Sequence, residues 1–339
     1  MSLPLFVDFE ARSRFDIDGG GRGYAQHPTT QIICGVLEWD SGGSRHVYRC
    51  DEPAAPPPLP KPLICCAHNA VNFDRFIWSK LGWPEPDYWI DTDEWARLGG
   101  LPRVGLDALA VRFLGRHKDL EGSKLMTRLR RWSKKTDDYQ YPLAPDMERV
   151  ISYCSQDVAD LEGIYPFLLP FAGNDLPGVR DTSLAVNDRG FHFDQDLAWT
   201  TLAADSILSE YAIAASGFPA EVISSPPQLR AAFESLGVPL ADVQADTIKP
   251  LLAHPDARVR SLAMARKAAT SITSGKLRAA LGAVSPDSRL RDQFRYHKAH
   301  TGRWAGRQFQ PHNLAKGKKL KNLDEQVAKF KAGDINGLG

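Results

Sequence analysis

The chain has 339 residues, 43% of them hydrophobic and 24% charged, with a formal net charge of +1 at pH 7. This composition suits one large or two medium globular domains and excludes disordered and collagen-like chains. The sequence holds no run of ~18 apolar residues for a membrane span, and its N-terminus lacks the basic start of a signal peptide. We therefore expect a cytosolic protein with no membrane contact.

Charge is unevenly distributed along the chain. Residues 258–331 contain 18 Lys and Arg against 4 Asp and Glu, whereas the remainder contains 24 against 37. A basic segment beside an acidic remainder is expected when one part binds a polyanion and another holds cations between carboxylates. A solvated Lys-rich helix and an acidic surface would give the same balance, so charge alone leaves both interpretations open.

The first part of the chain, residues 1–172, is predicted to be an α/β domain. Short apolar runs bounded by Gly, Ser or Asp predict strands, and a helical spacing of apolar residues predicts helices. The expected strands are 3–9, 31–39, 44–50 and 63–67, and the expected helices are 73–81, 106–114 and 147–169. A proline-rich connection, 53–62, precedes the last of these strands.

The pattern changes near residue 173, and residues 173–339 are predicted to form a second, mostly helical domain. The Asp and Gly within 187–190 favour a tight turn, so residues 184–193 are expected to form a strand pair. The expected helical runs are 195–215, 227–236, 246–280 and 315–333, and the stretch 289–300 is expected to be extended.

Acidic side chains at three places in the first domain are candidate metal ligands. Asp8 and Glu10 stand two apart on a predicted strand, so both carboxylates point to the same side of the sheet. Crowded carboxylates repel each other unless a divalent cation neutralises them, and Mg²⁺ or Mn²⁺ takes such oxygen ligands. Asp74 follows the 63–67 strand at the start of a helix, and Tyr153 and Asp157 are four apart on one helical face. Taken singly, these features are more often an acidic strand face, a helix cap and a surface hydrogen bond.

Together, these five residues, in this order and on these elements, resemble the DEDD superfamily of 3′-to-5′ exonucleases. A tyrosine four positions before the last aspartate resembles the tyrosine subclass, because the other subclass has a histidine five positions before it, where this chain has Ser152. The resemblance implies a ribonuclease-H-like fold over residues 1–172 and a site for two divalent metal ions, Mg²⁺ or Mn²⁺.

The resemblance also implies a role for each residue. Asp8 would bridge the two ions, Glu10 and Asp157 would bind the water-activating ion, and Asp74 would serve the second ion. Tyr153 would orient the attacking water, since an ordinary phenol is a poor base near neutral pH. Two divalent ions activate water and stabilise the leaving oxygen in phosphodiester hydrolysis, which is the chemistry that four carboxylates suit. Other acidic residues are expected to be surface or capping groups, namely Asp91, Asp107, Asp160 and Glu162.

Two stretches of the second half resemble family A, DNA polymerase I-like enzymes, especially those of bacteriophages. These are 184–194 (LAVNDRGFHFD) and 301–314 (TGRWAGRQFQPHNL). The resemblance implies that the second stretch contacts a primer-template duplex and that residues 195–280 form a thumb-like region. The predicted DNA-contacting residues are Asn69, in the loop before Asp74, together with Thr301, Arg303, Arg307, Gln310 and Asn313. An ordinary basic, Gly-rich loop is the alternative for 301–314.

The polymerase motifs that should follow this stretch are missing before Gly339, so we expect that this chain cannot polymerise. It would be a fragment, a truncated product, or one subunit of a split polymerase completed by a second polypeptide with the palm and fingers. An unfinished domain should also expose apolar surface.

The predicted function is proofreading removal of nucleotides from the single-stranded 3′ end of DNA during replication, in a bacterial or phage-infected cell. A ribonuclease D-like exoribonuclease and a non-catalytic DNA-binding module remain as alternatives.

Overall fold

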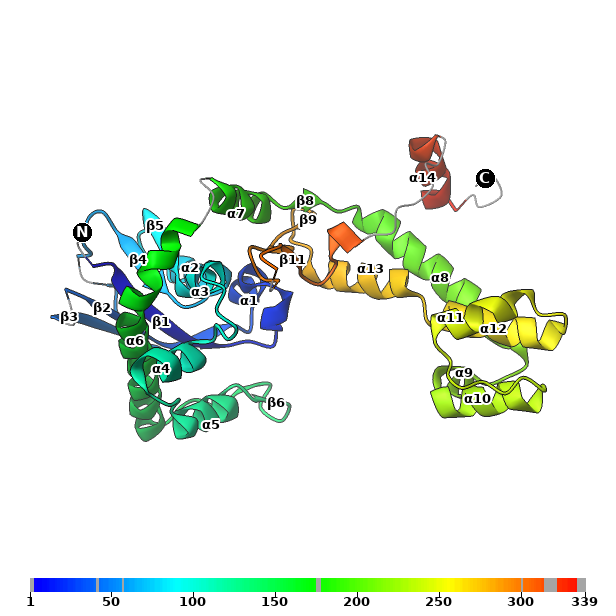
Figure 1. Cartoon of the computed structure of the whole chain (residues 1–339), viewed down its shortest axis with the longest axis horizontal. Helices are drawn as coiled ribbons and strands as arrows, with labels where there is room; N and C mark the ends of the chain where they lie inside the picture. Colours follow the sequence, from blue (N-terminus) through cyan, green and yellow to red (C-terminus); the bar gives the residue numbers. More distant parts are fainter. Residues whose placement is uncertain are drawn as a thin grey trace. The chain divides into compact units, whose positions relative to one another are not determined.

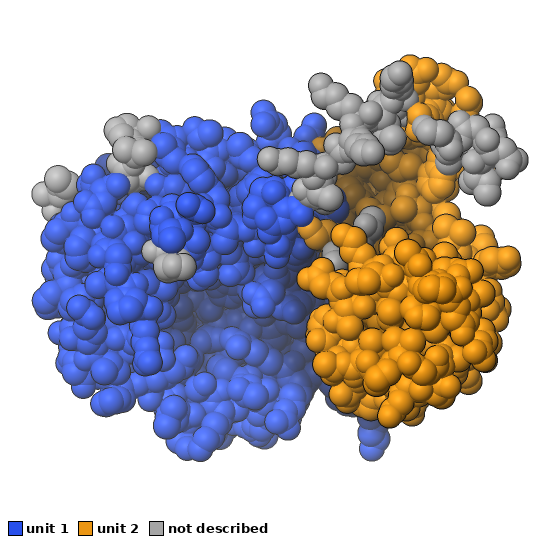
Figure 2. All heavy atoms as spheres, turned by 45° about the vertical axis from the view of Figure 1, so that its right-hand side comes forward, with its two compact units in different colours: residues 1–191, 285–314 blue, residues 192–284, 315–339 orange. Residues whose placement is uncertain are grey.

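The computed structural model describes residues 3–40, 43–56, 58–174, 178–299, 301–313 and 322–333. The chain divides into two compact units, coloured separately in Figure 2. Unit 1 is Met1–Phe191 with Ser285–Leu314, and unit 2 is His192–Val284 with Ala315–Gly339. None of the helices within the described ranges is both long and apolar enough to cross a membrane.

Unit 1 is a mixed α/β structure (Figure 1). Its longer strands are β1 (Leu5–Arg12), β2 (Gln31–Trp39), β3 (Ser44–Arg49), β4 (Ile64–Ala67) and β5 (Tyr88–Asp91). Its helices are α1 (Gly21–Gln26), α2 (Asp74–Lys80), α3 (Thr92–Leu98), α4 (Leu106–Leu114), α5 (Leu120–Leu129), α6 (Ala144–Leu168) and α7 (Val179–Arg189). The chain also has two-residue strands, namely β6 (Trp132–Ser133), β7 (Asp138–Tyr139), β8 (Phe191–His192), β9 (Arg289–Leu290), β10 (Phe294–Arg295) and β11 (Ala305–Gly306). The predicted opening sheet and the predicted helices of the first domain are therefore confirmed, with shifts of a few residues at their ends.

The five longer strands form one mixed sheet in the order β3-β2-β1-β4-β5. Strand β1 pairs antiparallel with β2 and parallel with β4, so it lies in the centre. Its alternate residues belong to two different apolar clusters, one on each face. Val7 and Phe9 pack with Trp78 of α2, and Phe6 packs with residues of α6 such as Val150. This alternation places the even-numbered side chains, including Asp8 and Glu10, toward the α6 side of the sheet.

The predicted strand pair at 184–193 is wrong, because residues 179–189 form helix α7. Gly190, with φ of 63°, ends that helix rather than turning a hairpin. Asn187 and Asp188, which were predicted to lie in a tight turn, make tertiary contacts instead. Asn187 exchanges two hydrogen bonds with the backbone of Phe294, at 2.7 and 3.1 Å, and Asp188 accepts hydrogen bonds from Arg75 at 2.8 and 3.0 Å.

Helix α7 is also held by a buried ion pair. Arg180 Nε lies 2.6 Å from Glu94 Oε2 of α3, and its other nitrogens donate to Tyr88 Oη and Trp89 O. Helix α7 and the 285–314 segment both belong to unit 1.

Unit 2 is helical, as expected for most of its length. Its helices are α8 (Gln195–Ser216), α9 (Ala220–Ser224), α10 (Pro226–Ser235), α11 (Ala245–Ile248), α12 (Ala257–Ala269), α13 (Ile272–Ala283) and α14 (Leu323–Lys331). The run 246–280 is interrupted because Asp256 and Ser271 each cap the start of a new helix. A separate apolar cluster that includes Phe233 and Leu262 forms the core. Helix α8 exposes large apolar side chains, since Trp199 is 60% and Tyr211 75% accessible. Residues 315–321 of the predicted Lys-rich helix lie outside the described ranges.

Candidate functional site

The central strand and the longest helix of unit 1 bring three predicted ligands together. Asp8 and Glu10 come from β1, and Asp157 comes from the middle of α6, which packs on that face of the sheet. Their ligand oxygens all lie within 4.8 Å of one another. A break in the β1–β2 register follows Glu10, so the bulge lies directly beside the site.

Asp74 follows the loop after β4 and lies close enough to Asp8 for its charge to raise the pKa of Asp8. It is the first residue of α2 and is 1% exposed. The backbone N–H of Phe9, between Asp8 and Glu10, donates to its carboxylate. Its other oxygen, Oδ1, is buried and has no hydrogen-bond partner among the described residues. A buried, unsatisfied carboxylate oxygen beside three converging carboxylates fits a divalent cation, since only oxygen ligands are offered.

Burial and mutual repulsion raise the pKa values of these carboxyl groups. The pKa of Asp8 rises well above its usual range, mainly because of burial and then because of the charges of Asp157, Glu10 and Asp74. Burial raises the pKa of Glu10 to about 7 and that of Asp157 to about 6. The cluster is therefore costly to ionise without a cation, and bound cations would remove that cost.

Two neighbours on α6 position the carboxylates. The Tyr153 hydroxyl hydrogen-bonds to the Asp157 carboxylate, one turn away, as the spacing predicts. Burial and the nearby carboxylates raise the pKa of Tyr153, so its hydroxyl keeps its proton. The Cys154 thiol donates to Asp8 Oδ2 at 3.2 Å from beneath the site. The ring of Tyr153 lies against Gly122 of α5, where an added Cβ would be 2.4 Å from Tyr153 Cδ2.

Two basic residues at the site were not predicted from the sequence. Arg130 Nη2 donates to Glu10 Oε2 at 3.1 Å, and the Lys118 ammonium lies 6.0 Å from the centre of the Tyr153 ring. The charge of Lys118 lowers the pKa values of both Glu10 and Asp157, although burial outweighs it. No sequence spacing ties these residues to the carboxylates, because they reach the site through the packing of the α4–α5 region.

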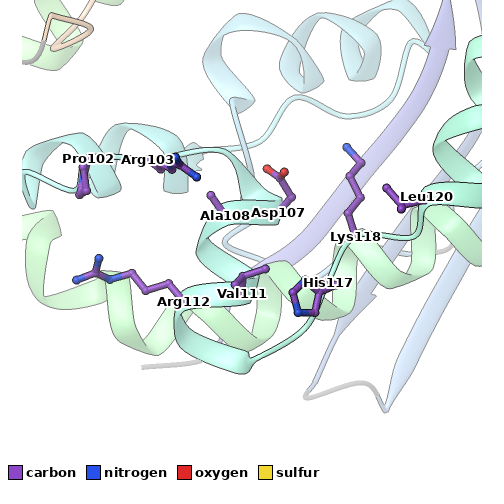
Figure 3. A pocket seen from close by; sticks show the side chains of 9 residues that line it. All are labelled: Pro102, Arg103, Asp107, Ala108, Val111, Arg112, His117, Lys118 and Leu120. Atoms are coloured by element: carbon purple, nitrogen blue, oxygen red, sulfur yellow. The ribbon is translucent and has the colours of Figure 1, made fainter.

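Lys118 also lines a pocket of about 500 Å³ formed by α4 and the segment that leads into α5 (Figure 3). Its lining includes three further basic residues, Arg103, Arg112 and His117. A basic pocket whose Lys118 lies near the carboxylate cluster is a suitable path for a phosphate backbone.

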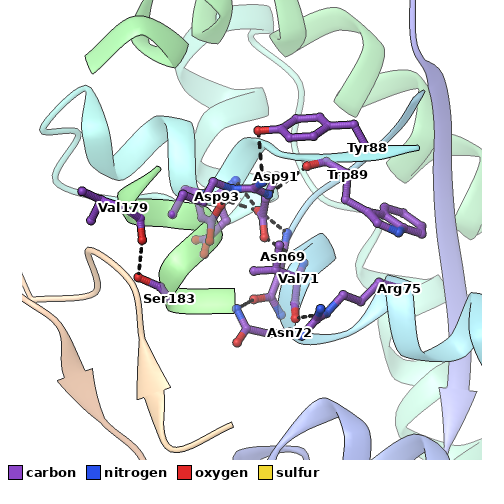
Figure 4. Close-up of polar contacts among 12 residues, drawn as sticks. Asn69, Val71, Asn72, Arg75, Tyr88, Trp89, Asp91, Asp93, Val179 and Ser183 are labelled. Carbon is purple, nitrogen blue, oxygen red and sulfur yellow. Dashed lines mark hydrogen bonds and ion pairs between the residues drawn. The ribbon is translucent and has the colours of Figure 1, made fainter. Parts of the chain in front are cut away.

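Asp91, expected to be a surface or capping group, is a buried cap. Its carboxylate accepts from the backbone N–H groups of Asp93 and Glu94 at the start of α3. It also accepts from the backbone of Asn69 at 3.0 Å and of Val71 at 3.1 Å, as Figure 4 shows. Asp91 therefore holds the loop that carries Asn69 and leads to Asp74.

The predicted DNA-contacting residues of 301–314 differ in their burial. Thr301 and Arg303 are exposed, whereas Arg307 is only 6% exposed. Gln310 accepts a hydrogen bond from Asn313 Nδ2 at 2.9 Å. Arg307 and Asn69, far apart in sequence, line the same pocket of unit 1.

Comparisons with known proteins relate the chain to DNA polymerases. It is 30% identical over 357 aligned residues to a DNA polymerase of Bacillus phage SP02, in an alignment that covers 98% of this chain and 54% of that polymerase. The chain thus spans about half the length of the curated relative it matches. No family model matches the chain.

Solved structures show a shared fold. The POL domain of Pol1 from M. smegmatis, in complex with DNA primer-template and dNTP, matches 94% of this chain and 53% of its own, with a TM-score of 0.61 and 16% identity. A nuclease in its apo form overlaps 54% of this chain and 80% of its own at 16% identity, but its TM-score of 0.35 is too low to support an argument. The chain is therefore similar along nearly its whole length to a DNA polymerase, and it has a fold found in a polymerase domain.

Proposed function

We propose that unit 1 is a metal-dependent 3′-to-5′ exonuclease of the DEDD tyrosine subclass that removes nucleotides from DNA 3′ ends. The carrying observation is the group of carboxylates of Asp8, Glu10 and Asp157, with the unsatisfied Asp74 oxygen beside them. The similarity to a phage DNA polymerase supports DNA as the substrate and proofreading as the role, and a ribonuclease-H-like description of the unit fits its central mixed sheet.

The side chains suggest a division of work. Asp8, Glu10, Asp74 and Asp157 would hold two divalent ions, Mg²⁺ or Mn²⁺. When bound, such ions lower the pKa of a coordinated water and neutralise charge on the phosphate and the leaving oxygen. Tyr153, kept protonated by its raised pKa, would orient the water through a hydrogen bond to its hydroxyl oxygen rather than remove the water's proton.

The remaining residues would position the ligands and the strand. Cys154 and Arg130 each fix one carboxylate by a hydrogen bond. Lys118, Arg103 and Arg112 would neutralise phosphates of the strand that enters the adjoining pocket. The proposed duplex contacts of a family A polymerase region are Thr301, Arg303, Gln310 and Asn313. The known relatives give no support for a second polypeptide that completes this region.

The test is cleavage of a 5′-labelled single-stranded DNA oligonucleotide in Mg²⁺ or Mn²⁺. Asp8→Asn and Asp157→Asn should each abolish the stepwise loss of 3′ nucleotides while circular dichroism shows an intact fold. Glu162→Gln, an isosteric change on α6 outside the cluster, should leave the rate unchanged. Normal cleavage by both aspartate variants would refute the site, and faster cleavage of a matched RNA would favour an exoribonuclease.

A further inference from the structure

A second charged depression in unit 1 is lined in part by the Asn69–Asp74 loop and by none of the four candidate ligands. Two adjoining pockets, one of about 290 Å³, share the lining residues Asp18, Arg295, Lys298 and Arg307. The smaller one is also lined by Arg97 of α3 and by Asn69 and Asn72 of the loop. We call the lining set Arg97, Arg295, Lys298, Arg307, Asn69 and Asn72 the basic hollow.

Two of the four cations already have carboxylate partners. Arg295 Nη2 lies 3.2 Å from Asp18 Oδ1, and Arg97 forms an ion pair with Asp93 one turn away. Lys298 lines the pocket with an exposed side chain and makes no hydrogen bond or ion pair with any described residue. The two pocket linings together hold these four cations against three carboxylates, Asp16, Asp18 and Asp93, and so carry an excess of positive charge.

Arg307 carries the strongest signal. It is 6% exposed, yet its Nε and Nη1 groups have no hydrogen-bond acceptor among the described residues. Its remaining nitrogen, Nη2, reaches Asn72 Oδ1 only at 3.5 Å. Arg295 Nε is also buried without an acceptor. Buried guanidinium donors are normally satisfied, so these donors lack an acceptor that a ligand would bring.

The pKa values of the cations in the hollow also indicate a site that lacks an anion. Burial, followed by the charge of Arg295, lowers the pKa of Arg307 to about 10, with Asp292 acting in the opposite direction. Partial burial of its ammonium group and the neighbouring arginines Arg97 and Arg295 lower the pKa of Lys298 to about 8. Like charges held this close favour the binding of an anion between them.

We propose that the basic hollow binds a phosphate group of a nucleic-acid backbone at a site separate from the carboxylate cluster. Arg307 would donate hydrogen bonds to phosphate oxygens from the guanidinium nitrogens that have no acceptor among the described residues. Lys298 would add a point charge from the rim. The choice of a polynucleotide over a free phosphate rests on the proposed function, since the loop that lines the hollow also leads to Asp74.

The test measures binding without cleavage. The full chain in EDTA is titrated into fluorescein-labelled single-stranded dT12 over a range of salt concentrations, and anisotropy gives the affinity. Lys298→Gln, at an exposed position, should reduce the slope of log affinity against log salt by roughly 0.7, the value for one phosphate contact on a single strand. Arg307→Gln should weaken binding about tenfold, and its fold is checked by circular dichroism. Lys80→Gln, an exposed lysine on α2 outside the hollow, should change neither quantity.

Further probes distinguish a nucleic-acid backbone from a free nucleotide or inorganic phosphate as the ligand of the hollow. A dT12 with uncharged methylphosphonate linkages should bind wild type and Lys298→Gln equally. If Lys298→Gln instead loses only dTMP or inorganic phosphate, and binds dT12 as the wild type does, the nucleic-acid assignment is wrong.

Wild-type binding of every probe by both hollow variants would overturn the site itself. Because metal is absent, failure of the proposed nuclease activity leaves these results unaffected, and the two claims can fail independently.

Discussion

The carboxylate cluster predicts an unusual stability effect for the isosteric variant Glu10→Gln. The Glu10 side chain is 6% exposed, and its burial raises its pKa from the usual 4.5 to about 7. A group whose pKa is higher in the folded than in the unfolded chain destabilises the fold as pH rises between those two values. Without metal, the wild type should therefore lose stability between about pH 4.5 and pH 7, and remain penalised above it.

The magnitude follows from the pKa change. At 1.36 kcal/mol for each pKa unit, a rise from 4.5 to about 7 corresponds to about 3 kcal/mol at pH 8. Gln removes the buried charge but also weakens the contact with Arg130, so a net gain of about 1–3 kcal/mol is expected. For a chain of this size, that gain raises the melting temperature by about 2–4 °C for each kcal/mol.

The assay is thermal unfolding of the wild type and Glu10→Gln in EDTA at pH 4.5 and pH 8. The variant should be more stable at pH 8 and equal to the wild type at pH 4.5, where both side chains are neutral in the folded chain. Glu52→Gln, at an exposed position, should show no difference at either pH. Adding Mn²⁺ at pH 8 should raise the melting temperature of the wild type and not that of Glu10→Gln. A wild type that is as stable as the variant in EDTA at pH 8 would refute the reasoning.

Two further predictions concern packing. Arg180→Ala removes the cation that pairs with buried Glu94, so it should lower the free energy of unfolding by about 3–5 kcal/mol in a denaturant titration. Arg180→Lys should recover part of that loss. A loss below about 1 kcal/mol in Arg180→Ala would contradict the prediction. Gly122→Ala would place a Cβ 2.4 Å from the Tyr153 ring, so the ring must move. It should cost about 1–3 kcal/mol and slow metal-dependent cleavage, whereas Gly275→Ala in α13, with open space around it, should be neutral or stabilising.

The positions of the candidate ligands were largely readable from the sequence. The two-residue spacing of Asp8 and Glu10 puts them on one face of a strand, because side chains alternate along a strand. The four-residue spacing of Tyr153 and Asp157 puts them one helical turn apart, and the structure joins them by a hydrogen bond. These are local geometric consequences of backbone periodicity, and they do not depend on what packs nearby.

Local chemistry was misleading where tertiary contacts used the same residues. Asn187, Asp188 and Gly190 resemble a hairpin turn, yet the first two bind Phe294 and Arg75, and the glycine ends a helix. A side chain that hydrogen-bonds a distant residue has the same sequence signature as one that caps its own turn, so only the packed structure distinguishes them.

The sequence alone determined the α/β sheet, the helical character of the second half and which carboxylates share a face. Only the tertiary structure decided that Lys118 and Arg130 reach those carboxylates and that Arg307 lies buried beside Asn69. The physical reason is that periodicity fixes the direction of a side chain from its own element. Which charges become neighbours, and which lose their water, depends on how distant segments pack together.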